Sequence, residues 1–139
     1  MAVILINDSE ARQLSGERSL VAAATAIKRL GPERIVIKKG EHGALLFGRD
    51  TVLAVPALIL PEVVDPTGAG DSFAGGFLAS LAAAGADRRT PDGAFRAAML
   101  AGTVAASFVP EGFSVQGLLR RTPAESAARL DRLRAMMIP

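Results

Sequence analysis

Two short apolar runs separated by helix-like sequence constrain the fold of this chain more than any other feature. The runs are Ala2–Ile6 and Arg34–Lys38, and their β-branched interiors are typical of buried strands. Between them the sequence predicts one helix from Asp8 or Ser9 to about Ser15. A second predicted helix starts at Ser19 and ends at Gly31, which is followed by a proline. Strands that alternate with helices favour an α/β fold, in which helices cover a sheet.

A hairpin and three further helices are expected after these elements. The segment Gly43–Val55 has the pattern of a β-hairpin. The first of the helices would span residues 70 to about 84, and the second would begin with Thr90 as N-cap and Pro91 in its first position. The third would begin with a capping box between Thr122 and Glu125. The expected core positions of the three helices are Phe73, Phe77, Leu81, Phe95, Met99, Gly102, Ala106, Leu130, Leu133 and Met137.

The length and composition describe one globular domain over residues 1–139. Half of the 139 residues are apolar and 22% are charged, which is enough apolar sequence for a core. The chain has no Cys and one His, His42, which excludes disulfides, Cys-based zinc sites and a His-rich metal centre. His42 lies in a turn-like Gly-Glu-His-Gly segment and is not expected to act as a catalytic base.

The charge and hydropathy patterns argue against nucleic-acid and membrane partners. The pI is 9.7, but the net charge is only +2, the basic residues are scattered, and Tyr and Trp are absent. The N-terminal stretch has no basic region of a signal peptide, and no apolar run is long enough to span a bilayer. We expect a cytoplasmic protein. Nucleic-acid binding, suggested by the pI alone, would require steeply salt-dependent binding to DNA.

An acidic residue follows a glycine-rich segment at the predicted start of the helix at residue 70. The Gly68-Ala69-Gly70 segment has almost no side chain, so an anion could approach the N–H groups of the helix N-terminus. A P-loop would place Gly-Lys-Ser/Thr here, whereas this chain has Gly70-Asp71-Ser72. A carboxylate suits acceptance of a proton from a hydroxyl that attacks phosphorus. Complete transfer of the hydroxyl proton to Asp71 before the attack on phosphorus would cost roughly 16 kcal/mol, so this proton has to be transferred late in the reaction. Asp71 could instead be an ordinary favourable charge in the first turn of a structural helix.

The complete segment from Asp65 to Phe77, DPTGAGDSFAGGF, closely resembles the C-terminal signature of the PfkB carbohydrate kinases, the ribokinase-like sugar and nucleoside kinases. Asn7-Asp8-Ser9-Glu10 resembles the family's Asn-x-x-Glu motif, and IVIKKGEHGALLF resembles its nucleotide-binding strand and turn. The resemblance implies a ribokinase-like layered α/β fold, of which this chain is the C-terminal, ATP-binding part. It also implies transfer of the γ-phosphoryl of ATP to a hydroxyl of a sugar or nucleoside.

The resemblance also implies a role for each matching residue. Asp71 would be the catalytic base, with Gly68, Ala69 and Gly70 forming an anion hole for the phosphoryl group. Asn7 and Glu10 would order Mg²⁺ and its water near the phosphates. The nucleotide-binding residues would be Lys38 and Gly40, which line the nucleotide, Gly43, which shapes the adjacent turn, and Ala101 and Gly102 on the adenine side. Asp65 and Thr67 fall where many members hold a monovalent cation such as K⁺.

Several of these residues could instead have a purely structural role. Asn7 and Glu10 could form a capping box and no more. Neighbouring strand residues face opposite ways, so only one of Lys38 and Lys39 is expected to reach a phosphate. Ala101 and Gly102 could simply allow two helices to pack closely.

Whole members of the resembled family have a comparable stretch before this part, which supplies the rest of the sheet, most of the acceptor pocket and the lid. The sequence therefore leaves open whether this chain is an enzyme by itself. The alternative is a non-catalytic module that binds nucleotide or self-associates. In either case we expect a homodimer, or a partner chain, to cover the exposed side of the sheet.

Overall fold

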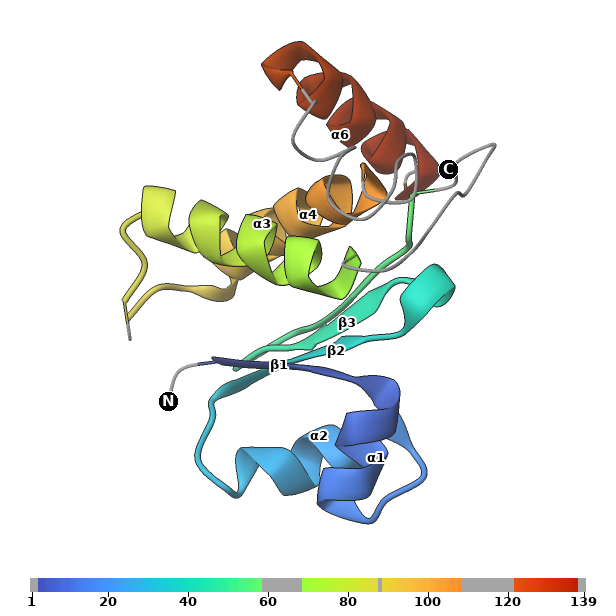
Figure 1. Cartoon of the computed structure of the whole chain (residues 1–139). Helices are drawn as coiled ribbons and strands as arrows, with labels where there is room; N and C mark the ends of the chain where they lie inside the picture. The colour runs from blue at the N-terminus through green and yellow to red at the C-terminus, as the bar shows by residue number, and fades with distance from the viewer. Residues whose placement is uncertain (1–2, 59–68, 88, 109–121, 138–139) are drawn as a thin grey trace. The chain divides into compact units, whose positions relative to one another are not determined.

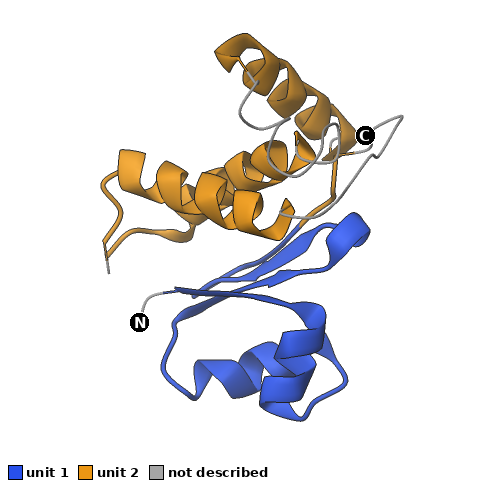
Figure 2. Cartoon of the chain, viewed as in Figure 1, with its two compact units in different colours: residues 1–54 blue, residues 55–139 orange. Residues whose placement is uncertain are grey.

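The structure, a computed structural model, describes residues 3–58, 69–87, 89–108 and 122–137 (Figure 1). The chain divides into two compact units, Met1–Ala54 and Val55–Pro139 (Figure 2).

Unit 1 contains a mixed four-stranded sheet and two helices. The sheet has the strand order β1-β2-β3-β4, in which β1 pairs with β2 in parallel and β2 pairs with β3 antiparallel. The elements are β1 (Val3–Asn7), α1 (Asp8–Ser15), α2 (Leu20–Lys28), β2 (Arg34–Lys38), the 3-10 turn η1 (Gly40–His42), β3 (Ala44–Phe47) and β4 (Val52–Val55), whose last residue is counted in unit 2. The two helices form the connection between the parallel strands β1 and β2, as such a pair requires.

The core of unit 1 lies between the sheet and these two helices. Small side chains of the helices allow close packing onto the β-branched side chains of β2 and onto Phe47 of β3. The buried members of this core are Ala11, Ala23, Ala24, Ile27, Ile35, Ile37 and Phe47. By contrast, all five residues of β1 are only half-buried, and β1 is the edge of the described sheet.

Unit 2 contains three described helices, α3 (Ala69–Ala83), α4 (Asp92–Ser107) and α6 (Pro123–Met137). Helices α3 and α4 pack along each other, and α6 packs on α4 (Figure 1). A chain of aromatic contacts runs through the α3–α4 interface: the ring of Phe77 is 6.2 Å from that of Phe73 and 6.2 Å from that of Phe95. Phe77, the middle one of these three rings, is completely buried.

Most of the predicted elements are confirmed within one or two residues. The strand Arg34–Lys38 and the helix ending at Ser15 have the predicted bounds, and α3 shows the expected buried stripe of Phe73, Phe77 and Leu81. The capping box of α6 is present, with the Thr122 hydroxyl accepting a bond from the Glu125 N–H at 3.2 Å. In α6 only Leu133 is fully buried, while Leu130 and Met137 are half-buried.

Two predicted helix boundaries are wrong. The helix predicted to reach Gly31 ends at Lys28. Pro91, not Thr90, is the N-cap of α4, because the Thr90 hydroxyl instead accepts a hydrogen bond from the Asp87 N–H at 2.7 Å. Among the residues that the structure describes, no helix is long and apolar enough to cross a membrane.

Candidate functional site

The carboxyl ends of β1 and β2 bring two predicted site residues together in unit 1. The two strands are parallel, and Asn7 is the register partner of Lys38. Both residues are therefore the last of their strands at the same edge of the sheet. In open α/β sheets, ligands bind beyond this edge.

Asn7 and Glu10 form a complete capping box at the start of α1. The Glu10 N–H donates to the Asn7 side-chain oxygen at 2.7 Å, and the Asn7 N–H donates to Oε2 of Glu10 at 2.9 Å. The structural alternative weighed for this motif is thus observed, and it accounts for both residues without a ligand. Glu10 is nevertheless exposed, so its carboxylate also faces solvent.

Lys38 and Lys39 do not form the simple alternating pair that the sequence predicts. The strand β2 ends at Lys38, and Lys39 already belongs to the turn, with its N–H bonded to the Gly43 carbonyl at 2.7 Å. Both side chains are half-buried. Because Lys39 lies outside the strand, the pleat alone does not decide which of the two lysines can reach a phosphate.

The turn between β2 and β3 requires glycine at two predicted site positions. Gly40 has φ +60° and Gly43 has φ +92° with ψ −150°, and the second combination is essentially restricted to glycine. No heavy atom would lie within 4 Å of a Cβ built on Gly40, so the turn presents bare backbone there. Such a surface permits close approach of a ligand.

In unit 2, α3 begins with the predicted anion hole and base. The first two helical residues are Ala69 and Gly70, and Gly70 and Asp71 are both exposed. Within the described parts of the chain, the Asp71 carboxylate has no hydrogen bond and no ion pair. The next residues, Ser72 and Phe73, are both only 6% exposed. The exposed Asp71 is therefore followed directly by residues of the buried core.

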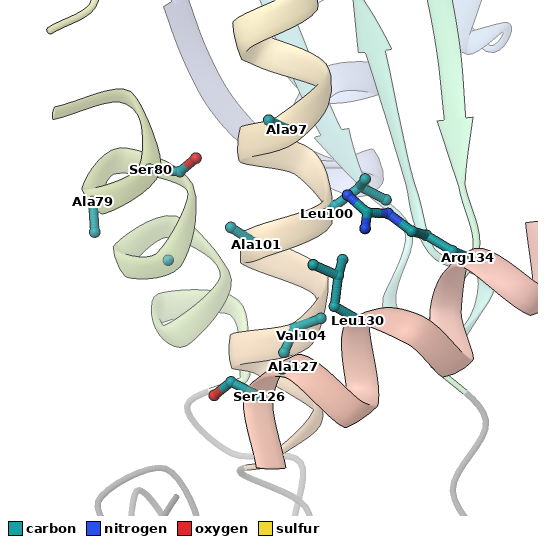
Figure 3. Close-up of a pocket in the computed structure, with 11 residues that line it drawn as sticks. Ala79, Ser80, Ala97, Leu100, Ala101, Val104, Ser126, Ala127, Leu130 and Arg134 are labelled. Atoms are coloured by element: carbon teal, nitrogen blue, oxygen red, sulfur yellow. The ribbon is translucent and has the colours of Figure 1, made fainter. Parts of the chain in front are cut away.

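The predicted nucleotide contacts in α4 lie in two different environments. Gly102 is buried, and a Cβ built on it would lie 2.8 Å from the Phe73 carbonyl oxygen. Ala101 is half-buried and lines a groove of about 470 Å³ between α3, α4 and α6, whose lining includes Arg134 (Figure 3). The geometry of Gly102 matches close helix packing, the alternative raised for it from the sequence.

Three predicted site residues, Asp65, Thr67 and Gly68, lie outside the described residues. Within the described ones, no group of three or more His, Asp or Glu side chains is placed to hold a metal ion.

Sequence reasoning missed the anchor that joins α6 to the end of α4. The Arg129 guanidinium lies 3.8 Å from the centre of the Phe108 ring and donates to the Ser107 carbonyl at 2.8 Å. No local signal could have found this contact, because its partners are 21 and 22 residues apart in the chain.

Comparison with protein families decides what this arrangement belongs to. The family model of the pfkB carbohydrate kinases matches residues 1–118, which is most of the chain. The chain belongs to the pfkB family. The recognition made from DPTGAGDSFAGGF is therefore confirmed.

Curated relatives are sugar and nucleoside kinases. The chain is 42% identical over 79 residues to the cytidine kinase of Thermococcus kodakarensis, an alignment that covers 55% of this chain and 28% of that protein. It is 31% identical over 107 residues to the 2-dehydro-3-deoxygluconokinase of Escherichia coli, covering 75% of this chain and 33% of that one. The chain thus spans about a third or less of these two relatives.

Solved structures confirm the ribokinase-like fold. Aminoimidazole riboside kinase from Salmonella enterica, solved with aminoimidazole riboside and an ATP analog, matches with a TM-score of 0.78 and 25% identity over 93% of this chain and 42% of that one. Ribokinase from Thermotoga maritima matches with a TM-score of 0.75 and 26% identity, covering 94% of this chain and 42% of that chain. A fructokinase from Vibrio cholerae, solved with fructose, ADP and potassium, has a TM-score of 0.80 over 92% of this chain and 40% of that chain, but at 23% identity this match shows the fold alone.

Proposed function

We propose that this chain is the ATP-binding part of a pfkB kinase that transfers the γ-phosphoryl group of ATP to a hydroxyl of a sugar or nucleoside. The observation that carries the proposal is Asp71, an exposed acid without a described partner in the first turn of α3, within the family's signature segment. The bond from phosphorus to the bridging oxygen of ADP breaks as the bond to the acceptor oxygen forms. The acceptor proton passes to Asp71 late in the transfer.

The start of α3 supplies the charge that this reaction needs. The N–H groups of the first turn point out of the helix N-terminus, where the helix dipole favours negative charge. We assign Ala69 and Gly70, together with Gly68, to hold the oxygens of the transferred group. Gly70 has no side chain that would obstruct the approach of a phosphate. The acid then orients the acceptor hydroxyl beside this anion hole.

The carboxyl edge of β1 and β2 fits the nucleotide end of the reaction. Lys38 ends its strand beside Asn7, and the bare turn at Gly40 leaves room for a ligand along the backbone. A relative of known structure was solved with an ATP analog. We infer that Lys38 faces a phosphate oxygen and that the exposed Glu10 interacts with Mg²⁺ through water. Bound ATP would supply the phosphoryl group, and Mg²⁺ would neutralise part of its charge.

Asp65 and Thr67 are proposed to hold a monovalent cation, and Ala101 to line the adenine side of the nucleotide site. The first two lie outside the described residues, so their assignment rests on their place in the signature. Ala101 is half-buried beside the groove of unit 2 and could contribute its methyl group to an apolar ligand surface.

One observation favours a second function, that of a non-catalytic module that retains the scaffold. The capping box between Asn7 and Glu10 accounts for these residues as parts of α1 alone. In that case the chain would bind nucleotide weakly or not at all. The chain spans less than half the length of the relatives cited above, so the kinase activity of those whole proteins is only proposed for this chain.

We also propose that a homodimer, or a partner chain, covers the edge of the described sheet that β1 forms. The strand consists of Val-Ile-Leu-Ile-Asn without a charge, and all of its residues are half-buried. Edge strands without charge, proline or a bulge are prone to pairing with another strand. Sedimentation velocity on the wild type and on Leu5→Lys tests this: a dimer that dissociates in the variant supports the proposal, and a monomeric wild type overturns the homodimer.

Phosphorus NMR with a panel of acceptors tests the proposed reaction directly. The panel follows the relatives and contains cytidine, aminoimidazole riboside, 2-dehydro-3-deoxygluconate, inositol and fructose. Appearance of a phosphate-ester signal together with ADP supports the proposal. ATP binding without any ester would favour the non-catalytic module.

A further inference from the structure

The interface between α3 and α4 is so close at Gly102 that no side chain fits there. A Cβ on Gly102 would lie 2.8 Å from the Phe73 carbonyl oxygen and 3.2 Å from two carbons of the Phe73 ring. The first distance is shorter than real Cβ contacts, and a backbone oxygen inside a helix cannot rotate away as a flexible side chain can. The backbone of α3 therefore rests directly on the Cα of Gly102.

Phe73 has little room to yield to such a contact. Its ring stacks on Phe77 at an interplanar angle of 16°, and Phe77 is fully buried against Phe95. A displacement of the Phe73 peptide group would therefore be transmitted along the backbone of α3. Phe73 follows Asp71 by two residues, and the intervening Ser72 is buried, so the displacement reaches the first turn of α3.

We propose that Gly102 is a positioning residue, which sets the place of the first turn of α3 and thereby of Gly70 and Asp71. The proposal rests on the function proposed above for these two residues. Gly102 would then support the anion hole through helix packing and would not line the nucleotide site. Substitution by alanine would displace the turn while leaving every side chain of the site unchanged.

Gly76 offers a matched control in the same interface. A Cβ on Gly76 would lie 2.7 Å from the Ala105 Cβ, 2.9 Å from the Ala101 carbonyl oxygen and 3.2 Å from the Gly102 Cα, so Gly76→Ala introduces a comparable clash further along the same interface. Gly76 lies five residues beyond Asp71, more than a full turn further from the start of α3. Both variants should lower the melting temperature, but only Gly102→Ala should disturb the first turn.

Amide hydrogen exchange without nucleotide separates the two variants. In Gly102→Ala we expect the amides of Ser72 and Phe73 to exchange about tenfold faster than in the wild type, and in Gly76→Ala less than about twofold faster. If Gly102→Ala does not fold, Phe73→Leu, which removes the ring atoms beside Gly102, should accelerate exchange of the same amides. Unchanged exchange in this turn, or equal acceleration in both alanine variants, would overturn the proposal.

Titration with ATP and Mg²⁺ then tests the functional consequence. We expect Gly102→Ala to weaken ATP binding by about tenfold, and Gly76→Ala, whose clash lies further from the start of α3, to weaken it less. Altered exchange with unchanged ATP affinity would overturn the functional role and leave a packing role. If the wild type binds no ATP, the proposed function fails, and the exchange data alone decide whether Gly102 positions the turn.

Discussion

The two helix starts that carry predicted site residues differ in how their polar groups are used. At α1, Asn7 and Glu10 bond to each other's backbone N–H groups, and Asp8 is placed 3.5 Å from Arg12 and accepts from the Ser9 N–H. At α3, Asp71 is exposed and has no such partner among the described residues. An acid in the first turn is favourable at both helices.

The difference shows which of the two motifs needs a ligand to explain it. The α1 motif is explained by the folding of its own helix, so its role in ATP binding requires separate evidence. The α3 motif has two small residues followed by an acid that no described contact uses. We therefore place the chemistry at α3 and expect α1 to contribute mainly the geometry of the sheet edge.

The largest expected effect separates the two first-turn acids. Asp71→Asn should lower the rate of phosphoryl transfer by about 10²–10⁴-fold, because the amide cannot accept the acceptor proton. Asp8→Asn should leave the rate unchanged and cost at most about 0.5 kcal/mol of stability, since its ion pair with Arg12 is exposed. Steady-state kinetics with the best acceptor of the panel measures both variants, and equal losses would break the comparison.

A smaller effect should separate the two neighbouring lysines. Lys38→Met should weaken binding of ATP by about tenfold or more, because a charge-assisted bond to phosphate is lost. Lys39→Met should change the affinity by less than about twofold, since the proposal places the phosphate against Lys38, the register partner of Asn7. Calorimetry on both variants checks this; a larger loss in Lys39→Met would reassign the phosphate contact.

The smallest effect tests whether the α1 motif is only a cap. Asn7→Ala should destabilise the protein by about 1 kcal/mol, while Asn7→Ser, which keeps the cap, should be nearly neutral. Thr122→Ala, at the capping box of α6, serves as the control for loss of a cap away from the site. Thermal unfolding and ATP titration are measured together. If Asn7→Ser folds normally but binds ATP much more weakly, the Asn7 amide has a role beyond capping.

The elements that could be predicted from the sequence are those whose signals are local. The β-branched run Arg34–Lys38 and the stripe of Phe73, Phe77 and Leu81 are each set by a short repeat of apolar residues, and both are observed. The prediction that Thr90 is the N-cap of α4 was wrong, and the reason is also local. Thr90 and Pro91 are neighbours that could both occupy this position, and the Thr90 hydroxyl accepts a hydrogen bond from the Asp87 N–H instead.

Features that depend on pairing between distant segments could not be predicted. The register that places Asn7 beside Lys38 follows from which strands pair, and the sequence states only that strands exist. The close approach of Gly102 to Phe73 was open between packing and ligand contact until the neighbouring helix was seen. The candidate base was found from its signature, since the DPTGAGDSF segment is dense enough to identify the family.

The most direct test of the central claim, that the start of α3 binds the phosphate end of ATP, is calorimetry with ATP and Mg²⁺ on three proteins. These are the wild type, Gly70→Pro and Gly93→Pro, which place proline at the second residue of α3 and of α4. Proline is tolerated in a first turn, so both variants should fold, and each loses one first-turn N–H. We predict that the wild type binds, that Gly70→Pro binds about tenfold more weakly, and that Gly93→Pro matches the wild type. A folded wild type that does not bind, or equal affinities for Gly70→Pro and Gly93→Pro, would contradict the account.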